Sequence, residues 1–201
     1  MPIAGIIAEY NPLHAGHVHL MEEARCLLGP DTAILCVMSG DFVQRGDFAL
    51  APKRARAAAA VESGADLVLE LPLPWAVSAA EAFSAGAVEL LENTGVVTHL
   101  VFGSECGDAA ALNRVAAALN GEAFSERVRG ELTAGDTFAA ARQRAVSALT
   151  SREDAALLER PNNILGVEYC KSLQRLHSRI QAVTVLRTGA AHDAESGASS
   201  S

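Results

Sequence analysis

Two histidines, His14 and His17, are the residues of this sequence whose spacing points most directly to chemistry. They bracket Gly16 in a turn between an apolar run, residues 3–8, and a stretch of helical composition. Open parallel sheets bind ligands where a strand ends and a helix begins, because the first helical amides are free hydrogen-bond donors. The glycine leaves room for a phosphate, and two imidazoles can donate hydrogen bonds to its developing charge. This turn predicts nucleotidyl transfer at an α-phosphate, although two histidines at this spacing are often incidental when that context is absent.

A second candidate site is the glycine-rich loop that follows the second apolar run. Its polar residues Ser39, Gln44 and Arg45 are candidates for binding a second substrate at the same edge of the sheet, because glycines let a ligand approach the backbone. A solvated loop without a ligand explains the same composition. Three cations follow this loop and either contact phosphate or RNA or simply solvate a helix; they are Lys53, Arg54 and Arg56.

Four further candidates lie later in the chain. Gly103 ends the fourth apolar run, where a missing side chain lets adenine or ribose lie against the backbone, and Glu105 is either a partner for ribose hydroxyls or a solvated acid. Asn163 stands near the start of a helix, where asparagine is a common cap. Arg187 directly follows the last apolar run and either neutralises triphosphate charge or lies on the surface.

The elements that must position these residues alternate between strand and helix. Apolar runs rich in β-branched residues predict buried strands at residues 3–8, 32–38, 66–71, 96–102 and 180–186. Helical composition predicts helices at residues 16–28, 53–63, 78–92, 109–119 and 163–176. Repeated β-α units predict an α/β fold, a Rossmann-like doubly wound parallel sheet with helices on both faces.

The segment from about residue 121 to 158 has no strand-like run and predicts a helical insertion of two helices before the last strand. We expect one nucleotide-binding domain at residues 1–190. Residues 191–201 are small and polar, and we expect them to form a flexible tail at the start of a C-terminal region that is missing from this chain.

The composition is that of a globular chain: 201 residues, 50% of them hydrophobic, with a formal net charge of -8. This charge argues against a surface that binds nucleic acid throughout, but it leaves local contact with RNA open. No apolar run is long enough to cross a bilayer and the first residues lack a secretion signal, so we expect a cytoplasmic protein. Four widely spaced cysteines without a C-x-x-C pair predict buried thiols.

The H-x-G-H pattern after a first strand resembles the nucleotidyltransferase superfamily of pantetheine-phosphate and nicotinamide-mononucleotide adenylyltransferases and class I tRNA synthetases. Longer words are more narrowly similar to the bacterial tRNA(Met) cytidine acetate ligase family, and they span nearly the whole chain. They are Ala8-Glu9-Tyr10-Asn11-Pro12, Met38-Ser39-Gly40-Asp41-Phe42-Val43-Gln44-Arg45-Gly46, Glu70-Leu71-Pro72, Phe102-Gly103-Ser104-Glu105 and Pro161-Asn162-Asn163-Ile164-Leu165-Gly166.

This resemblance implies a two-step reaction. ATP and acetate, with Mg²⁺ shielding the triphosphate, would form acetyl-adenylate and pyrophosphate, and the wobble cytidine of elongator tRNA(Met) would then take the acetyl group on N4. His14 and His17 would be the catalytic residues, and no protein ligand to a metal, DNA partner or membrane partner is expected. The ATP-binding residues that the resemblance implies are Ile7, Ala8, Glu9, Tyr10, Asn11, Pro12, Leu13, His14, Ala15, Gly16, His17, Val18, His19, Leu20, Gly103, Asn163 and Arg187.

Two other functions are compatible with the short motif. An adenylyltransferase that joins AMP to a small phosphorylated metabolite would use the same H-x-G-H turn, and a non-catalytic nucleotide- or RNA-binding module would keep the fold without turnover. Members of the family that the chain resembles continue beyond the region of Arg187 with a further segment and a C-terminal domain. Because this sequence ends at Ser201, we expect weak ATP binding and an incomplete tRNA surface.

Overall fold

In the part of the chain that the computed structural model describes, residues 1–133 and 137–187, five strands form one parallel sheet. Their order is β3-β2-β1-β4-β5, which places the first strand at the centre. The strands are β1 (Ile3–Ala8), β2 (Ala33–Ser39), β3 (Leu67–Leu71), β4 (His99–Ser104) and β5 (Gln181–Leu186). The predicted α/β class and parallel sheet are confirmed, while the tail predicted at residues 191–201 lies outside the described residues.

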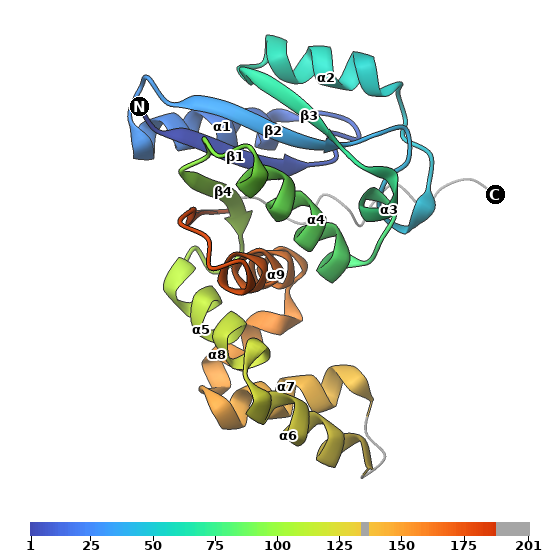
Figure 1. Cartoon of the computed structure of the whole chain (residues 1–201), viewed down its shortest axis with the longest axis vertical. Coiled ribbons are helices and arrows are strands. Elements are labelled where there is room, and N and C mark those ends of the chain that lie inside the picture. Colours follow the sequence, from blue (N-terminus) through green and yellow to red (C-terminus); the bar gives the residue numbers. More distant parts are fainter. Residues whose placement is uncertain (134–136, 188–201) are drawn as a thin grey trace, which may run out of the picture.

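Helices connect the successive strands and cover the sheet (Figure 1). Among the described residues they are α1 (Ala15–Leu28), α2 (Lys53–Glu62), α3 (Leu73–Ala76), α4 (Ala80–Asn93), α5 (Ala109–Asn120), α6 (Glu122–Thr133), α7 (Phe138–Leu149), α8 (Arg152–Ala156) and α9 (Pro161–Arg175), with 3-10 helices η1 (Gln44–Gly46) and η2 (Leu157–Glu159). The segment at about 121–158 therefore contains α6, α7 and the short α8, where two helices were predicted. A helix of five residues is little more than one turn, so it cannot show a repeated helical period in the sequence.

Alternation along the strands decides which face of the sheet each side chain covers. Ile6 of β1 packs in a buried cluster with Met21 of α1 and Ala60 of α2. Ile7, the next residue, packs in a second cluster with Leu91 of α4 and with residues of α9. The sheet is thus covered by α1 and α2 on one face and by α4 and α9 on the other, while α6 and α7 lie at the end of the molecule far from α2 (Figure 1).

The carboxyl ends of the strands meet at one edge, because all the strands run in the same direction. Ala8 at the end of β1 pairs with Met38 of β2, and Ser104 at the end of β4 pairs with Leu186 at the end of β5. The loops that leave these strand ends carry the predicted site residues. Parallel pairing is therefore what gathers residues that are distant in the sequence at this edge of the sheet.

The four cysteines are free thiols that differ in exposure. Cys36 and Cys170 are buried as predicted, and Cys106 is half-buried, but the prediction of a buried thiol is wrong for Cys26. The buried face of α1 includes Ala24. A residue two positions further lies about 200° around the helix, so Cys26 points outward. None of the helices in residues 1–133 and 137–187 is long and apolar enough to cross a membrane.

Candidate active site

His14 and His17 lie together at the start of α1, in the turn that leads from β1. His14 is the N-cap residue, and its Nδ1 accepts a hydrogen bond from the Gly16 amide at 3.1 Å. The Nδ1 of His17 accepts from the His14 amide at 3.2 Å, and the two rings stack with their centroids 3.8 Å apart. Because both Nδ1 atoms act as acceptors, the proton of each neutral ring lies on Nε2. Each ring therefore keeps one N–H donor for a ligand.

Tyr10 supports the His17 ring from the core. Its side chain is fully buried, and its hydroxyl lies 3.0 Å from the Cys36 Sγ. The Tyr10 ring meets the His17 ring edge to face, with centroids 4.9 Å apart. Tyr10 has a φ of 47°, a left-handed conformation that turns the chain after β1. Tyr10 thus shapes the turn with its backbone and holds the imidazole of His17 with its ring.

The electrostatic surroundings keep His17 neutral. Burial, followed by the electrostatic influence of His14 and Arg187, lowers the pKa of His17 to about 4. The ring therefore acts as a neutral Nε2–H donor at neutral pH, and the guanidinium of Arg187 supplies a positive charge near it. A fixed neutral donor beside a permanent cation is suited to stabilising negative charge that develops on phosphate oxygens.

The turn after β1 is joined to the loop after β2 by two side chains. Glu9 Oε1 accepts a hydrogen bond from the Gln44 amide at 2.6 Å, and Asn11 Oδ1 accepts one from the Leu50 amide at 2.6 Å. Within the segment implied to bind ATP, Ile7 is buried in the sheet, whereas residues 14–16 are exposed. Glu9 and Asn11 therefore fix the loop after β2, while residues 14–16 of the H-x-G-H turn are accessible to solvent.

The loop after β2 contains two buried polar atoms without a partner. Ser39 is fully buried at the end of β2, and its Oγ makes no hydrogen bond. The Nε2 of Gln44 is buried and unpaired in the same way. A buried polar group without a hydrogen bond costs about 1–3 kcal/mol, so two in one loop call for an explanation such as a ligand. The side chain of Arg45, the third predicted residue, lies outside the described part of the structure.

The three cations that follow the loop differ in burial and partners. Arg56 is buried with 3% exposure and donates hydrogen bonds to the backbone carbonyls of Glu9, Ser39, Gly40 and Ala51. Lys53 pairs with Glu70 at 2.7 Å, and Arg54 is exposed. Arg56 therefore ties the ends of β1 and β2 together, a role that sequence reasoning missed. The available signal was its spacing of four from the buried Ala60, which places both on the inner face of α2.

Arg187 and Gly103 lie against each other at the ends of β5 and β4. A Cβ atom at position 103 would lie 3.1 Å from Arg187 Cγ, so the arginine covers the bare backbone of the glycine. The Arg187 amide donates to the Ser104 carbonyl at 2.9 Å, and Nη1 donates to Asn162 Oδ1 at 3.3 Å. The guanidinium is also close enough to His17 to affect its pKa. The structure thus brings together His17, Gly103 and Arg187, although they are distant in the sequence.

Asn163 does not cap its own helix, as asparagine at a helix start ordinarily does. The N-cap of α9 is Arg160, and Asn163 is buried with 2% exposure. Its Oδ1 accepts hydrogen bonds from the amides of Glu105 and Cys106 at 3.0 and 3.1 Å. The carboxylate of Glu105 in turn accepts hydrogen bonds from the backbone amides of Asn162 and Asn163 and from the side chain of Asn162.

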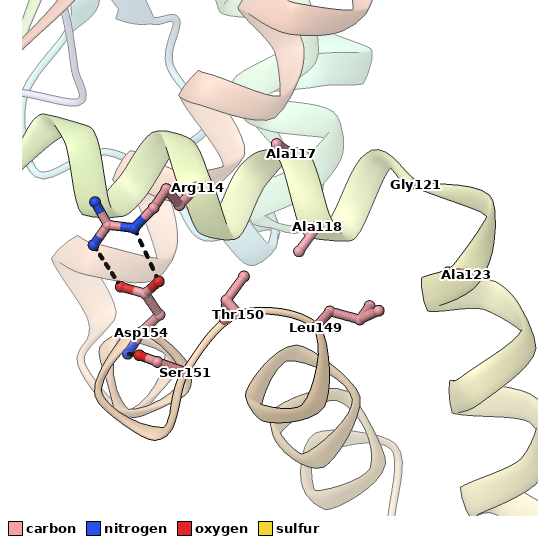
Figure 2. A pocket seen from close by; sticks show the side chains of 9 residues that line it. All are labelled: Arg114, Ala117, Ala118, Gly121, Ala123, Leu149, Thr150, Ser151 and Asp154. Carbon is pink, nitrogen blue, oxygen red and sulfur yellow. Dashed lines mark hydrogen bonds and ion pairs between the residues drawn. The ribbon is translucent and has the colours of Figure 1, made fainter.

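A hollow of about 660 Å³ lies elsewhere, between α5 and the turn that joins α7 to α8 (Figure 2). Small side chains line most of it, and the bidentate ion pair of Arg114 and Asp154 closes one end (Figure 2). It shares no residue with the predicted site. The candidate site is therefore defined by the loops at the carboxyl edge of the sheet.

Two comparisons relate the chain to known proteins at the level of sequence. It is 41% identical over 207 residues to the tRNA(Met) cytidine acetate ligase of Halothermothrix orenii, a match that covers 98% of this chain and 49% of the relative. It is 45% identical over 205 residues to the ligase of the same name from Alkaliphilus metalliredigens, covering 96% of this chain and 48% of the relative. The chain spans about half the length of the curated relatives it matches.

The fold is similar to that of a solved relative. Thermotoga maritima TmcAL bound with alpha-thio ATP superposes with a TM-score of 0.89 at 42% sequence identity, over 94% of this chain and 47% of that one. The model of the HIGH Nucleotidyl Transferase family matches residues 1–201. Together with the H-x-G-H turn at the start of α1 and the parallel sheet that presents it, this match shows that the chain belongs to the HIGH nucleotidyl transferase family.

Proposed function

We propose that this chain carries the ATP- and acetate-activating site of a tRNA(Met) cytidine acetate ligase. In the first step a carboxylate oxygen of acetate attacks the α-phosphorus of ATP, the bond to the β-phosphate oxygen breaks, and pyrophosphate leaves. In the second step N4 of the wobble cytidine of elongator tRNA(Met) attacks the acetyl carbon, AMP leaves, and N4 loses a proton. A tRNA substrate also makes the cytoplasm the compartment in which the protein acts.

The convergence of His14, His17 and Arg187 is the observation that carries this proposal. The two imidazoles supply Nε2–H donors at the N-terminus of α1, and Arg187 supplies a charge beside them. Such a set stabilises negative charge on a triphosphate without a covalent intermediate on the protein. Identity of 41% and 45% to two ligases of this name supports the choice of acetate and tRNA(Met) as the remaining substrates.

ATP is proposed to lie along residues 7–20, with Gly103, Asn163 and Arg187 on its other side. Gly103 lets the side chain of Arg187 pack against its bare backbone. Asn163 has its Oδ1 committed to the loop after β4, which leaves its Nδ2 as the donor for nucleotide. Within residues 1–133 and 137–187, no group of three or more His, Cys, Asp or Glu residues could hold a metal ion. Mg²⁺ is proposed to arrive on the triphosphate itself, where it would shield the phosphate charge.

Acetate is proposed to bind near Ser39, Gln44 and Arg45. The unpaired Ser39 Oγ and Gln44 Nε2 support this assignment, because a carboxylate accepts hydrogen bonds from such donors. Ser39 is the last residue of β2, next to the end of β1, and Gln44 lies in the loop that follows. An acid bound there would approach the α-phosphate of a nucleotide that lies on the H-x-G-H turn.

Exchange of labelled pyrophosphate into ATP tests the proposal directly. We expect exchange that depends on acetate, and a His14→Ala/His17→Ala double variant that loses roughly 100-fold or more of it, as the removal of charge-stabilising donors does elsewhere. His177→Asn is the matched control, because His177 is exposed and its φ of 49° is one that asparagine tolerates. Exchange that ignores acetate would favour an adenylyltransferase, and ATP binding without exchange would favour a non-catalytic module; either result contradicts the ligase assignment.

A further inference from the structure

The loop after β4 and the start of α9 hold each other through reciprocal hydrogen bonds. Glu105 Oε1 accepts from the Asn162 amide at 3.1 Å and from its Nδ2 at 2.7 Å, and Oε2 accepts from the Asn163 amide at 2.7 Å. The N-cap residue of α9, Arg160, provides no side-chain cap of its own. Glu105 therefore satisfies the free amides of α9 from another element and places a negative charge at the positive end of the helix dipole.

The same carboxylate decides which way the Asn162 carboxamide faces. Its Nδ2 donates to Glu105, so its Oδ1 faces the other way and accepts from Arg187 Nη1 at 3.3 Å. A carboxylate can only accept and a guanidinium can only donate, so the two partners together permit one orientation of the amide. A flipped amide would turn its donor group toward Arg187 and its acceptor toward Glu105, and both contacts would be lost.

Arg187 is thereby held from two sides. Its aliphatic part covers Gly103, and its guanidinium meets the Asn162 oxygen. From this place the guanidinium contributes, after burial and His14, to the lowered pKa of His17. Burial by itself would raise the pKa of Glu105. The hydrogen bonds from the Asn162 side chain and from the backbone amides of residues 162 and 163 outweigh it, so the pKa is lowered and the carboxylate is ionised at neutral pH.

We propose that Glu105 is a positioning residue for Arg187, acting through Asn162 to hold the guanidinium beside His17, where the triphosphate of ATP is proposed to bind. Glu105 itself does not touch the nucleotide, since both of its oxygens bind the start of α9. The inference rests on the proposed function in one respect, that ATP is the ligand beside Arg187. The hydrogen bonds that connect Glu105 to Arg187 are present in the protein without ligand. The two ideas can therefore fail separately.

The first readout is the dissociation constant of Mg-ATP, measured by calorimetry on the 201-residue chain. We expect Arg187→Gln, Glu105→Gln and Asn162→Ala each to weaken binding by roughly fivefold to tenfold, as the loss of one well-placed charged contact does. Asn162→Ala keeps the hydrogen bonds from the backbone amides of α9 to Glu105 and removes only the side chain between Glu105 and Arg187. It therefore tests the connection of Glu105 to Arg187 even if Glu105→Gln disturbs folding. Glu126→Gln, on the exposed face of α6, is the matched control and should bind as the wild type does.

The second readout is the pH at which the His17 ring titrates in the ligand-free protein, followed by NMR of its ring nitrogens. Removal of a negative charge at position 105 would, by itself, lower the pKa of a nearby imidazole. Release of Arg187 raises it, because the guanidinium is one of the causes of the low value. The two explanations predict opposite signs, so a rise in Glu105→Gln and Asn162→Ala identifies positioning of Arg187.

Double-mutant cycles with Arg187→Gln measure whether Glu105 acts through Arg187. If Glu105 acts through Arg187, then Asn162→Ala has no further effect on ATP binding or on the His17 titration once Arg187→Gln is present, and Glu105→Gln no longer raises the His17 pKa. Additive effects, or an unchanged His17 titration in both Glu105→Gln and Asn162→Ala, would overturn the inference. A wild-type chain that does not bind Mg-ATP would contradict the proposed function alone, because the His17 titration still decides the role of Glu105.

Discussion

Acidification should destabilise this protein through His17. The pKa of the folded ring is lowered to about 4, against 6.5 for an unperturbed histidine, and the first cause is burial. The unfolded chain therefore takes up a proton on this ring at a higher pH than the folded chain does. The stabilising contribution of neutral His17 is complete above about pH 6.5 and is lost progressively as the pH falls toward about 4.

The size of the effect follows from the two pKa values. Linkage between protonation and folding gives a loss of about 2 kcal/mol in the free energy of unfolding between about pH 7.5 and about pH 5. The ring is half-buried, so solvent screening reduces this figure to about 1–2 kcal/mol. The remaining loss, below about pH 5, overlaps with the titration of carboxylates and is harder to assign.

Urea unfolding followed by circular dichroism, at several pH values across this window, measures the effect. His17→Asn is the comparison, because it removes the titrating ring while every other ionisable group is retained. The wild type should lose about 1–2 kcal/mol more than His17→Asn between the two ends of the window. Equal pH dependence in the two proteins would refute the argument, since it would mean that His17 binds protons equally well in the folded and unfolded states.

Two further predictions concern packing at the carboxyl edge of the sheet. Arg56→Met should lower the free energy of unfolding by about 2–4 kcal/mol in urea titrations, because it leaves several backbone carbonyls without a donor. The control, Arg54→Gln at an exposed position, should change it by less than about 0.5 kcal/mol. An equal loss in both variants would contradict the role of Arg56 in tying β1 to β2. Gly103→Ala should weaken Mg-ATP binding roughly tenfold, because the added Cβ pushes Arg187 from its place, with little change in unfolding free energy. Gly130→Ala is the control for Gly103→Ala, because a Cβ at position 130 would meet no atom within 4 Å. An unaltered affinity in Gly103→Ala would show that Mg-ATP binding does not depend on the present position of Arg187.

Most of the fold was predictable from the order of apolar runs. The run at residues 3–8 became β1 with the predicted bounds, because a short continuous apolar stretch that ends in a turn is typical of a strand at the centre of a sheet covered on both faces. The fourth strand was expected at residues 96–102 and begins instead at His99. Val96 is 50% exposed, so its apolar character did not mark a buried strand, and strand ends are decided by the pairing partner.

The candidate site was predictable only in part. His14 and His17 were found because their spacing and the glycine between them are local properties of one turn. Arg56 and Glu105 were missed as structural residues because their partners lie far away: Arg56 reaches Glu9 across 47 positions, and Glu105 reaches Asn162 across 57. A charged residue in a loop or helix looks the same in the sequence whether it faces solvent or a set of backbone groups.

The sequence by itself determined the alternation of strands and helices, the parallel sheet, and the turn that carries two histidines at a helix N-terminus. These follow from local periodicity and turn chemistry, which act over a few residues. Only the tertiary structure decided that His17 is neutral, that Arg187 lies beside it on Gly103, and that Asn163 and Glu105 hold α9 to the loop after β4. Burial, electrostatic fields and hydrogen bonds between distant segments exist only once the chain has folded, because each depends on distances in space.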